Sequence, residues 1–276
     1  WKLGEVVSLQ HGQLPWAGHM PNFRHMMCSV KKFAAATAAV LFAGSGEAVA
    51  AQEARIEVDV ELVLAVDISY SVDEEEARRQ REGYVAALAS EDVINMIQGG
   101  PYGRIAVTYV EWADSGFQRA AADWMVISSE ADALTFASQV AAAPLERGHY
   151  TAIGSAIADG VARIRDNNFD APRRIIDISG DGPQNQGMSL EAAHALAEEE
   201  HVVVNGLPVI SERDGRWVRP VEVNLDAYFE ENVITGPGAF VLPARTEDEF
   251  AEAILRKLVL EIAGAAPAPV ELGRAP

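Results

Sequence analysis

The sequence is poor in the side chains that most often carry covalent or redox chemistry. It has one cysteine, Cys28, and six histidines in 276 residues. It also lacks a G-x-S-x-G elbow, a P-loop, an HExxH motif and a G-x-G-x-x-G run after its first strand-like segment. These absences argue against the common classes of serine hydrolase, nucleotidase, zinc protease and dehydrogenase.

Two segments at the N-terminus are not expected to belong to the folded domain. Residues 1–25 show no apolar period, and we interpret them as an upstream extension. Residues 26–50 resemble a secretory signal peptide, with Lys31 and Lys32 before the apolar run Phe33–Ala43 and small residues up to Ala50. We therefore expect cleavage near Ala50, which also removes Cys28, and a periplasmic or secreted protein.

Long apolar runs and positive charge are scarce after residue 50. The apolar run of the signal peptide is shorter than the ~20 residues that span a bilayer, and no later run reaches that length. Residues 51–276 carry 18 basic and 39 acidic side chains, a formal charge of −21. Such a surface repels nucleic acid and anionic lipid. We expect no transmembrane segment after cleavage and no nucleic-acid partner.

The remaining sequence alternates strand-like and helical segments. This alternation predicts a doubly wound α/β domain over residues 57–263, with a mostly parallel central sheet and helices on both faces. The short link at 114–116 makes one edge strand antiparallel, because a parallel crossover needs about a dozen residues. The Ala- and Pro-rich tail 264–276 is expected to be disordered. The predicted strands are 62–66, 104–111, 117–127, 174–179, 202–210 and 239–243, and the predicted helices are 73–88, 91–98, 130–142, 152–166, 189–200, 225–231 and 247–262.

Oxygen-bearing side chains follow the first of these strands at alternate positions. Asp67, Ser69 and Ser71 can converge there, since alternate strand residues share a face. Hard oxygen donors of this kind suit Mg²⁺, Mn²⁺ or Ca²⁺. Thr151 before a helix and Asp181 after the strand 174–179 fall at the same predicted sheet edge, where open α/β sheets bind ligands.

Each of these residues also has a purely structural interpretation. Ser71 is the first residue of an S-x-x-E capping box, Thr151 could be a helix N-cap, and Asp181 could serve a Gly-Asp-Gly turn. Asp177 lies inside an apolar strand and needs a partner, for which Arg173, Arg174 or a polar group on a neighbouring strand are candidates.

Taken together, the five residues carry a resemblance to a known family. Asp67-x-Ser69-x-Ser71, Thr151 in Thr-Ala-Ile-Gly and Asp181 in Ser-Gly-Asp-Gly look like the metal-ion-dependent adhesion site of von Willebrand factor A domains. The resemblance implies that the two serines and Thr151 ligate a divalent cation, most simply Mg²⁺, with the two aspartates acting directly or through water. More narrowly, the sequence resembles exported bacterial proteins of this type whose function is unassigned.

Three functions are compatible with these observations. The first is an exported protein-binding module in which a partner's carboxylate completes the coordination of the ion, as the resemblance implies. The second is a metal-assisted hydrolase that uses the same ion. The third is a structural protein of the cell envelope in which the ion only holds loops together. The sequence contains no catalytic motif that favours the second.

Overall fold

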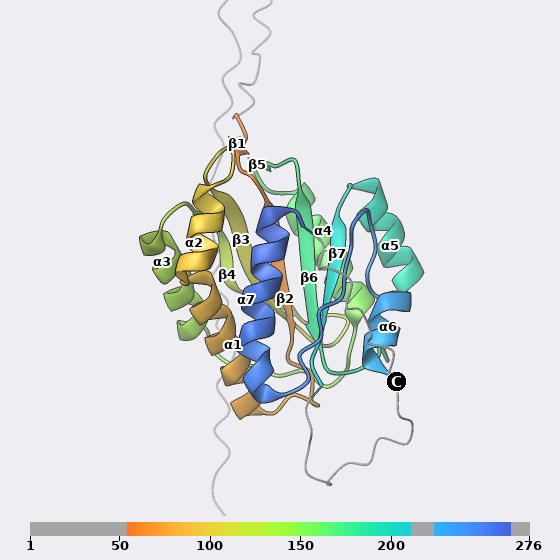
Figure 1. Cartoon of the computed structure of the whole chain (residues 1–276). Helices are drawn as coiled ribbons and strands as arrows, with labels where there is room; N and C mark the ends of the chain where they lie inside the picture. Colours follow the sequence, from red (N-terminus) through yellow and green to blue (C-terminus); the bar gives the residue numbers. More distant parts are fainter. Residues whose placement is uncertain (1–53, 211–223, 266–276) are drawn as a thin grey trace, which may run out of the picture. The chain divides into compact units, whose positions relative to one another are not determined.

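A five-stranded sheet forms the centre of the domain in the computed structural model, which describes residues 54–210 and 224–265 (Figure 1). The predicted extension 1–25, the signal peptide 26–50, residues 211–223 and the tail from 266 lie outside the described residues. The strand order is β4-β3-β2-β6-β7, and only the β3–β4 pair is antiparallel. The mixed sheet and its antiparallel edge strand are confirmed. The bounds are β2 (Glu61–Asp67), β3 (Ile105–Trp112), β4 (Gln118–Ile127), β6 (Arg174–Gly180) and β7 (Val203–Pro208).

Helices cover both faces of this sheet, as predicted (Figure 1). Every residue of β2 is buried, because its alternate side chains enter two different cores. Leu62, Leu64 and Val66 pack under α1 (Glu74–Leu88), α2 (Glu91–Gln98), α3 (Glu130–Ala142) and α7 (Glu247–Ala263). Val63 and Ala65 pack under α4 (Ile153–Arg165), α5 (Leu190–Glu199) and α6 (Leu225–Asn232). In the described ranges no helix is long and apolar enough to cross a bilayer.

Two details of the strand prediction need correction. A small parallel sheet of β1 (Ile56–Glu57) and β5 (Phe169–Asp170) was not predicted. The predicted strand 239–243 is instead an isolated parallel bridge of Val241 with Gly206 of β7, and a second bridge joins Ala244 to Val209 just beyond. The Leu242 N–H donates to the Gly206 carbonyl at 3.0 Å. The next rung would need an N–H from Pro208, which proline lacks, so one hydrogen bond is missing there. The pairing resumes beyond it, where the Ala244 N–H donates to the Pro208 carbonyl at 3.0 Å.

The first helix begins later than the capping-box interpretation requires. Asp73, not Ser71, is the N-cap of α1, and its Oδ1 accepts the Glu76 N–H at 2.8 Å. Thr151 is not a cap either, since the N-cap of α4 is Ala152, which makes no side-chain cap hydrogen bond. The cap interpretations of Ser71 and Thr151 are therefore wrong.

A buried network of charges supplies the partner of Asp177. Lys257 of α7 lies 2.8 Å from Asp177 Oδ1 and also contacts Glu261, and all three side chains are at most 1% exposed. Asn205 on β7 donates to Glu261 Oε1 at 2.9 Å. Burial and the nearby Asp177 charge raise the pKa of Glu261 to about 7. The predicted structural role of Asp177 is confirmed, but its cation comes from the last helix rather than from Arg173 or Arg174.

This network predicts a pH dependence of stability that belongs to Glu261. The pKa of Glu261 is about 7 in the folded state, against an ordinary value of 4.5. The contribution of Glu261 to the free energy of unfolding is therefore fully present below pH 4.5 and is lost as the pH rises to about 7. The loss amounts to ~3 kcal/mol at most. Glu261→Gln should therefore lose stability less steeply between pH 5 and pH 8 than the wild type in urea unfolding.

Two further variants make this prediction specific. Glu252→Gln, on an exposed position of the same helix, should keep the wild-type pH dependence. Lys257→Met should lose about 3–5 kcal/mol, because it leaves two buried carboxylates without their cation. An unchanged pH dependence in Glu261→Gln would show that this carboxyl group does not titrate in the range given.

Candidate metal centre

The predicted site residues lie at the carboxyl ends of β2 and β6. Asp67 is the last residue of β2, and Asp181 directly follows β6, its parallel neighbour. The chain leaves β2 toward β3 on one side and later returns to β6 on the other, so this edge is the switch point of the sheet. Open α/β sheets bind ligands at such a point because the loops diverge there.

Hydrogen bonds join three of the predicted side chains to one another. Ser69 Oγ and Ser71 Oγ are 3.0 Å apart, and Ser71 Oγ donates to Asp181 Oδ1 at 2.6 Å. Asp67 is tied to the same loop, because its Oδ1 accepts the Ser69 N–H at 2.7 Å. Asp67, Ser69 and Asp181 are buried and Ser71 is half-buried. Asp181 therefore does more than serve the turn in which it lies.

The second oxygen of Asp67 lies in a buried place. Asp67 Oδ2 is buried and makes no hydrogen bond with any part of the chain that the structure describes. It lies against β6, where a Cβ added to Gly180 would be 3.3 Å away. Burial, and next the charge of Asp181, raise the pKa of Asp67 well above its ordinary value. A carboxylate in this position needs a proton or a cation.

Thr151 reaches this edge through its backbone. Its N–H donates to Asn185 Oδ1 at 2.9 Å, and its carbonyl accepts the Asn185 N–H at 2.9 Å. The next N–H, of Ala152, donates to the Ala113 carbonyl beyond β3 at 2.9 Å. Thr151 is buried. These backbone bonds place Thr151 at the same edge of the sheet, and none of them joins it directly to the other four residues.

Sequence reasoning missed the polar residues that hold these loops. Besides Asn185, Gln184 Oε1 accepts the Gly154 N–H at 2.6 Å at the start of α4, and Asp114 Oδ2 accepts the His149 N–H at 2.8 Å. A Cβ at Gly154 would lie 2.3 Å from the Met188 carbonyl oxygen, so only glycine allows this approach. The polar run Gln184-Asn185-Gln186 after Pro183 was the sequence feature that could have indicated Gln184 and Asn185.

The donor set fits a hard divalent cation. Two carboxylates and three hydroxyls supply only oxygen, which Mg²⁺, Mn²⁺ and Ca²⁺ prefer, and the unsatisfied Asp67 Oδ2 provides a buried negative charge. Within residues 54–210 and 224–265 no cluster of three or more His, Cys, Asp or Glu exists that could hold a metal. The candidate centre differs from such clusters because most of its donors are hydroxyls.

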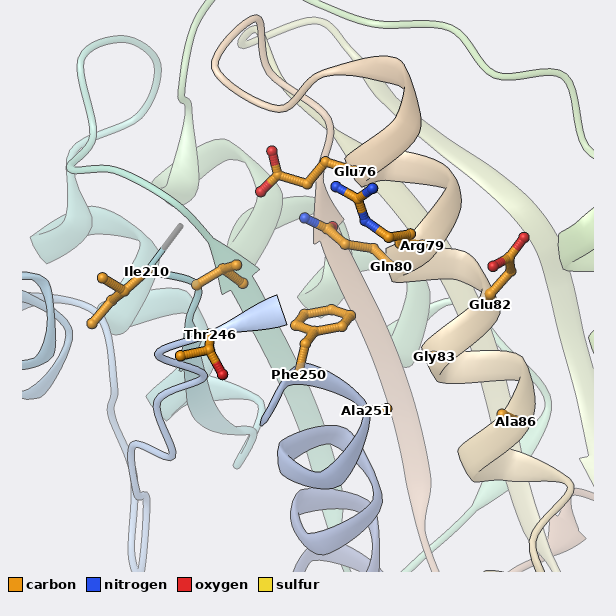
Figure 2. Close-up of a pocket in the computed structure, with 11 residues that line it drawn as sticks. Glu76, Arg79, Gln80, Glu82, Gly83, Ala86, Ile210, Thr246, Phe250 and Ala251 are labelled. Atoms are coloured by element: carbon orange, nitrogen blue, oxygen red, sulfur yellow. The ribbon is translucent and has the colours of Figure 1, made fainter. Parts of the chain in front are cut away.

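A cavity of about 310 Å³ lies elsewhere, between α1 and α7 (Figure 2). Glu76, Gln80 and Gly83 of α1 line one side, and Thr246 and Phe250 at the start of α7 line the other. None of the five candidate ligands lines it. The candidate metal centre and this cavity are therefore separate features.

Solved structures of the von Willebrand factor A type share this fold. Proximal thread matrix protein 1 from the mussel byssus, in a structure with a zinc-occupied MIDAS motif, matches with a TM-score of 0.50 and 16% identity over 74% of this chain and 46% of its own. The pilus adhesin SpaC from Lactobacillus rhamnosus GG matches with a TM-score of 0.53 and 13% identity over 75% and 31%. A von Willebrand factor type A protein from Catenulispora acidiphila gives 0.52 and 14% over 75% and 43%. The chain thus spans less than half of each of these proteins.

These matches show that the domain has an α/β fold like that of von Willebrand factor type A proteins. Within that class, residues 57–266 match the family described as protein of unknown function DUF1194, and the chain belongs to it. The resemblance expected from the motif is confirmed at the level of fold and family. A search of curated proteins found no match.

The candidate centre predicts that a divalent cation stabilises the protein. In Mg²⁺ at about 100 times its dissociation constant, the wild-type Tm should rise by ~5–10 °C relative to EDTA. Asp67→Asn keeps an oxygen for the Ser69 N–H but removes a carboxyl group whose ionisation is disfavoured by burial and by Asp181, which raise its pKa. It should melt above the wild type in EDTA at neutral pH and gain little from Mg²⁺, as measured by scanning calorimetry.

Asp170→Asn serves as the matched control for this experiment. Asp170 is exposed in β5 and belongs to no part of the cluster, so this variant should keep the wild-type response to Mg²⁺. An equal Mg²⁺ response in Asp67→Asn and the wild type would place the stabilising ion outside this cluster.

Proposed function

We propose that the protein is an exported, divalent-cation-dependent protein-binding module. Asp67, Ser69, Ser71, Thr151 and Asp181 would hold the ion, most simply Mg²⁺, with Mn²⁺ or Ca²⁺ as alternatives. The observation that carries the proposal is the meeting of two buried aspartates and two serine hydroxyls at one sheet edge, with Asp67 Oδ2 left unsatisfied. When bound, the ion supplies an open coordination position for a partner's carboxylate.

The residues of the chain have distinct parts in this function. Asp181 accepts a hydrogen bond from the Ser71 hydroxyl, which holds Ser71 on the loop. The Ser71 oxygen keeps a lone pair with which it can bind an ion. Asp67 holds the Ser69 N–H and so shapes the same loop. The two carboxylates only balance the charge of a divalent cation. A third carboxylate, from a partner, can therefore still bind the ion without strong repulsion from the site.

The comparisons support a role in adhesion without assigning one. SpaC is described as a pilus adhesin and proximal thread matrix protein 1 as a matrix protein. Both share only the fold with this chain at 13% and 16% identity, so the role is carried over as a proposal. The signal-peptide pattern at residues 26–50 supports export.

Capture from a cell-envelope extract of the host tests the proposal. The immobilised protein should retain a partner in Mg²⁺, release it in EDTA, and lose about tenfold or more of its affinity in Asp67→Ala. Asp170→Ala should bind as the wild type does. Retention that is equal in Mg²⁺ and EDTA would contradict the proposal.

The same preparations distinguish binding from catalysis and from a purely structural ion. Metal-dependent turnover of phosphate or carboxylate esters, lost in Asp67→Ala, would favour a hydrolase instead. A Tm that rises with Mg²⁺ and no captured partner would favour a structural ion.

A further inference from the structure

Exposed apolar side chains gather on the loops around the candidate metal centre. In the described ranges six large hydrophobic side chains are exposed, and three of them belong to these loops. Tyr70 is 68% exposed, Tyr150 50% and Met188 38%. Tyr70 lies between Ser69 and Ser71, and Tyr150 directly precedes Thr151. Single exposed apolar residues are ordinary, but a group of them around one site marks a contact surface.

The three loops are joined by hydrogen bonds, so the three side chains share one edge of the domain. The Gly148 N–H donates to the Ile68 carbonyl at 3.2 Å, which joins the loop of Tyr150 to that of Tyr70. The Met188 N–H donates to Ser155 Oγ at 3.1 Å, which joins Met188 to the start of α4 just beyond Thr151. We name Tyr70, Tyr150 and Met188 the apolar rim.

Tyr70 is held in place before any partner arrives. The Arg147 guanidinium lies 5.4 Å from the centre of the Tyr70 ring and donates to the Tyr70 carbonyl at 2.8 Å. The His149 ring stacks on Tyr70 with the centroids 6.0 Å apart and the planes at 26°. A large side chain that is already ordered loses little entropy on binding, which favours its use as a contact residue.

We propose that the apolar rim selects partner segments in which a single Asp or Glu is flanked by bulky apolar side chains. This inference rests on the proposed function, since the carboxylate goes to the ion. A segment with several acidic residues is disfavoured because the protein itself carries a charge of −21 after residue 50. Apolar neighbours gain buried area on Tyr70, Tyr150 and Met188 at no electrostatic cost.

Random linear peptides displayed on phage provide the probe. Peptides are selected on the immobilised full chain in Mg²⁺ and eluted with EDTA. We expect the enriched sequences to carry one acidic residue next to aromatic or large aliphatic residues. For a synthetic peptide of that sequence, Tyr70→Ala, Tyr150→Ala and Met188→Ala should each lower the affinity by about tenfold in Mg²⁺.

Two controls make the test specific to the rim. Tyr102 is exposed before β3, near the opposite edge of the sheet, and Tyr102→Ala should change the affinity less than about twofold. Arg147→Ala should weaken binding by freeing Tyr70, yet add little in a Tyr70→Ala background. Each variant is first checked for the wild-type Tm in Mg²⁺, which shows that the centre is intact.

The outcomes separate this inference from the proposed function. EDTA-eluted peptides without apolar neighbours, whose affinity the three rim variants leave unchanged, would overturn the inference and keep the proposed function. Peptides that bind equally in EDTA, or the absence of any enrichment, would contradict both. Selective Mg²⁺-dependent binding of an acidic polysaccharide in place of peptides would also overturn the inference, because the partner would then not be a protein.

Discussion

The parallel pairing of β2 with β6 creates the constraint on which the candidate site depends. It brings the ends of two strands together, so the loop after β2 and the loop after β6 share a hydrogen bond between residues 110 positions apart, Ser71 and Asp181. The same pairing places the charge of Asp181 where it raises the pKa of the buried Asp67. Two carboxylates that meet in a buried place repel each other until positive charge arrives as a proton or a cation.

Carboxylates are buried in two places, and their ion-pair partners differ between the two. Under α7, Asp177 and Glu261 share Lys257, so the positive charge is built into the fold. Asp67 has no ion-pair partner in the described chain, and its Oδ2 has no hydrogen bond. The first arrangement contains its own cation. The second has no ion pair to Asp67 within the described residues, which is the observation behind the proposed ion site.

The loops around this edge combine a rigid frame with an exposed surface. Asn185, Gln184 and Asp114 bind backbone groups of neighbouring loops and keep them in register. On this frame Tyr70 and Tyr150 remain in solvent. The cavity of about 310 Å³ lies elsewhere, between α1 and α7. Neither the five candidate ligands nor these two tyrosines line that cavity.

The α/β class, the antiparallel edge strand and most element bounds follow from the amino-acid sequence, because hydrophobic period and cap residues are local signals. It also singled out the five site residues as a motif. The tertiary structure was needed to show that Asp73 rather than Ser71 caps α1, that Pro208 interrupts the pairing beside β7, and that Lys257 partners Asp177. Those outcomes depend on contacts between residues that are far apart in the sequence, and local sequence patterns do not predict such contacts.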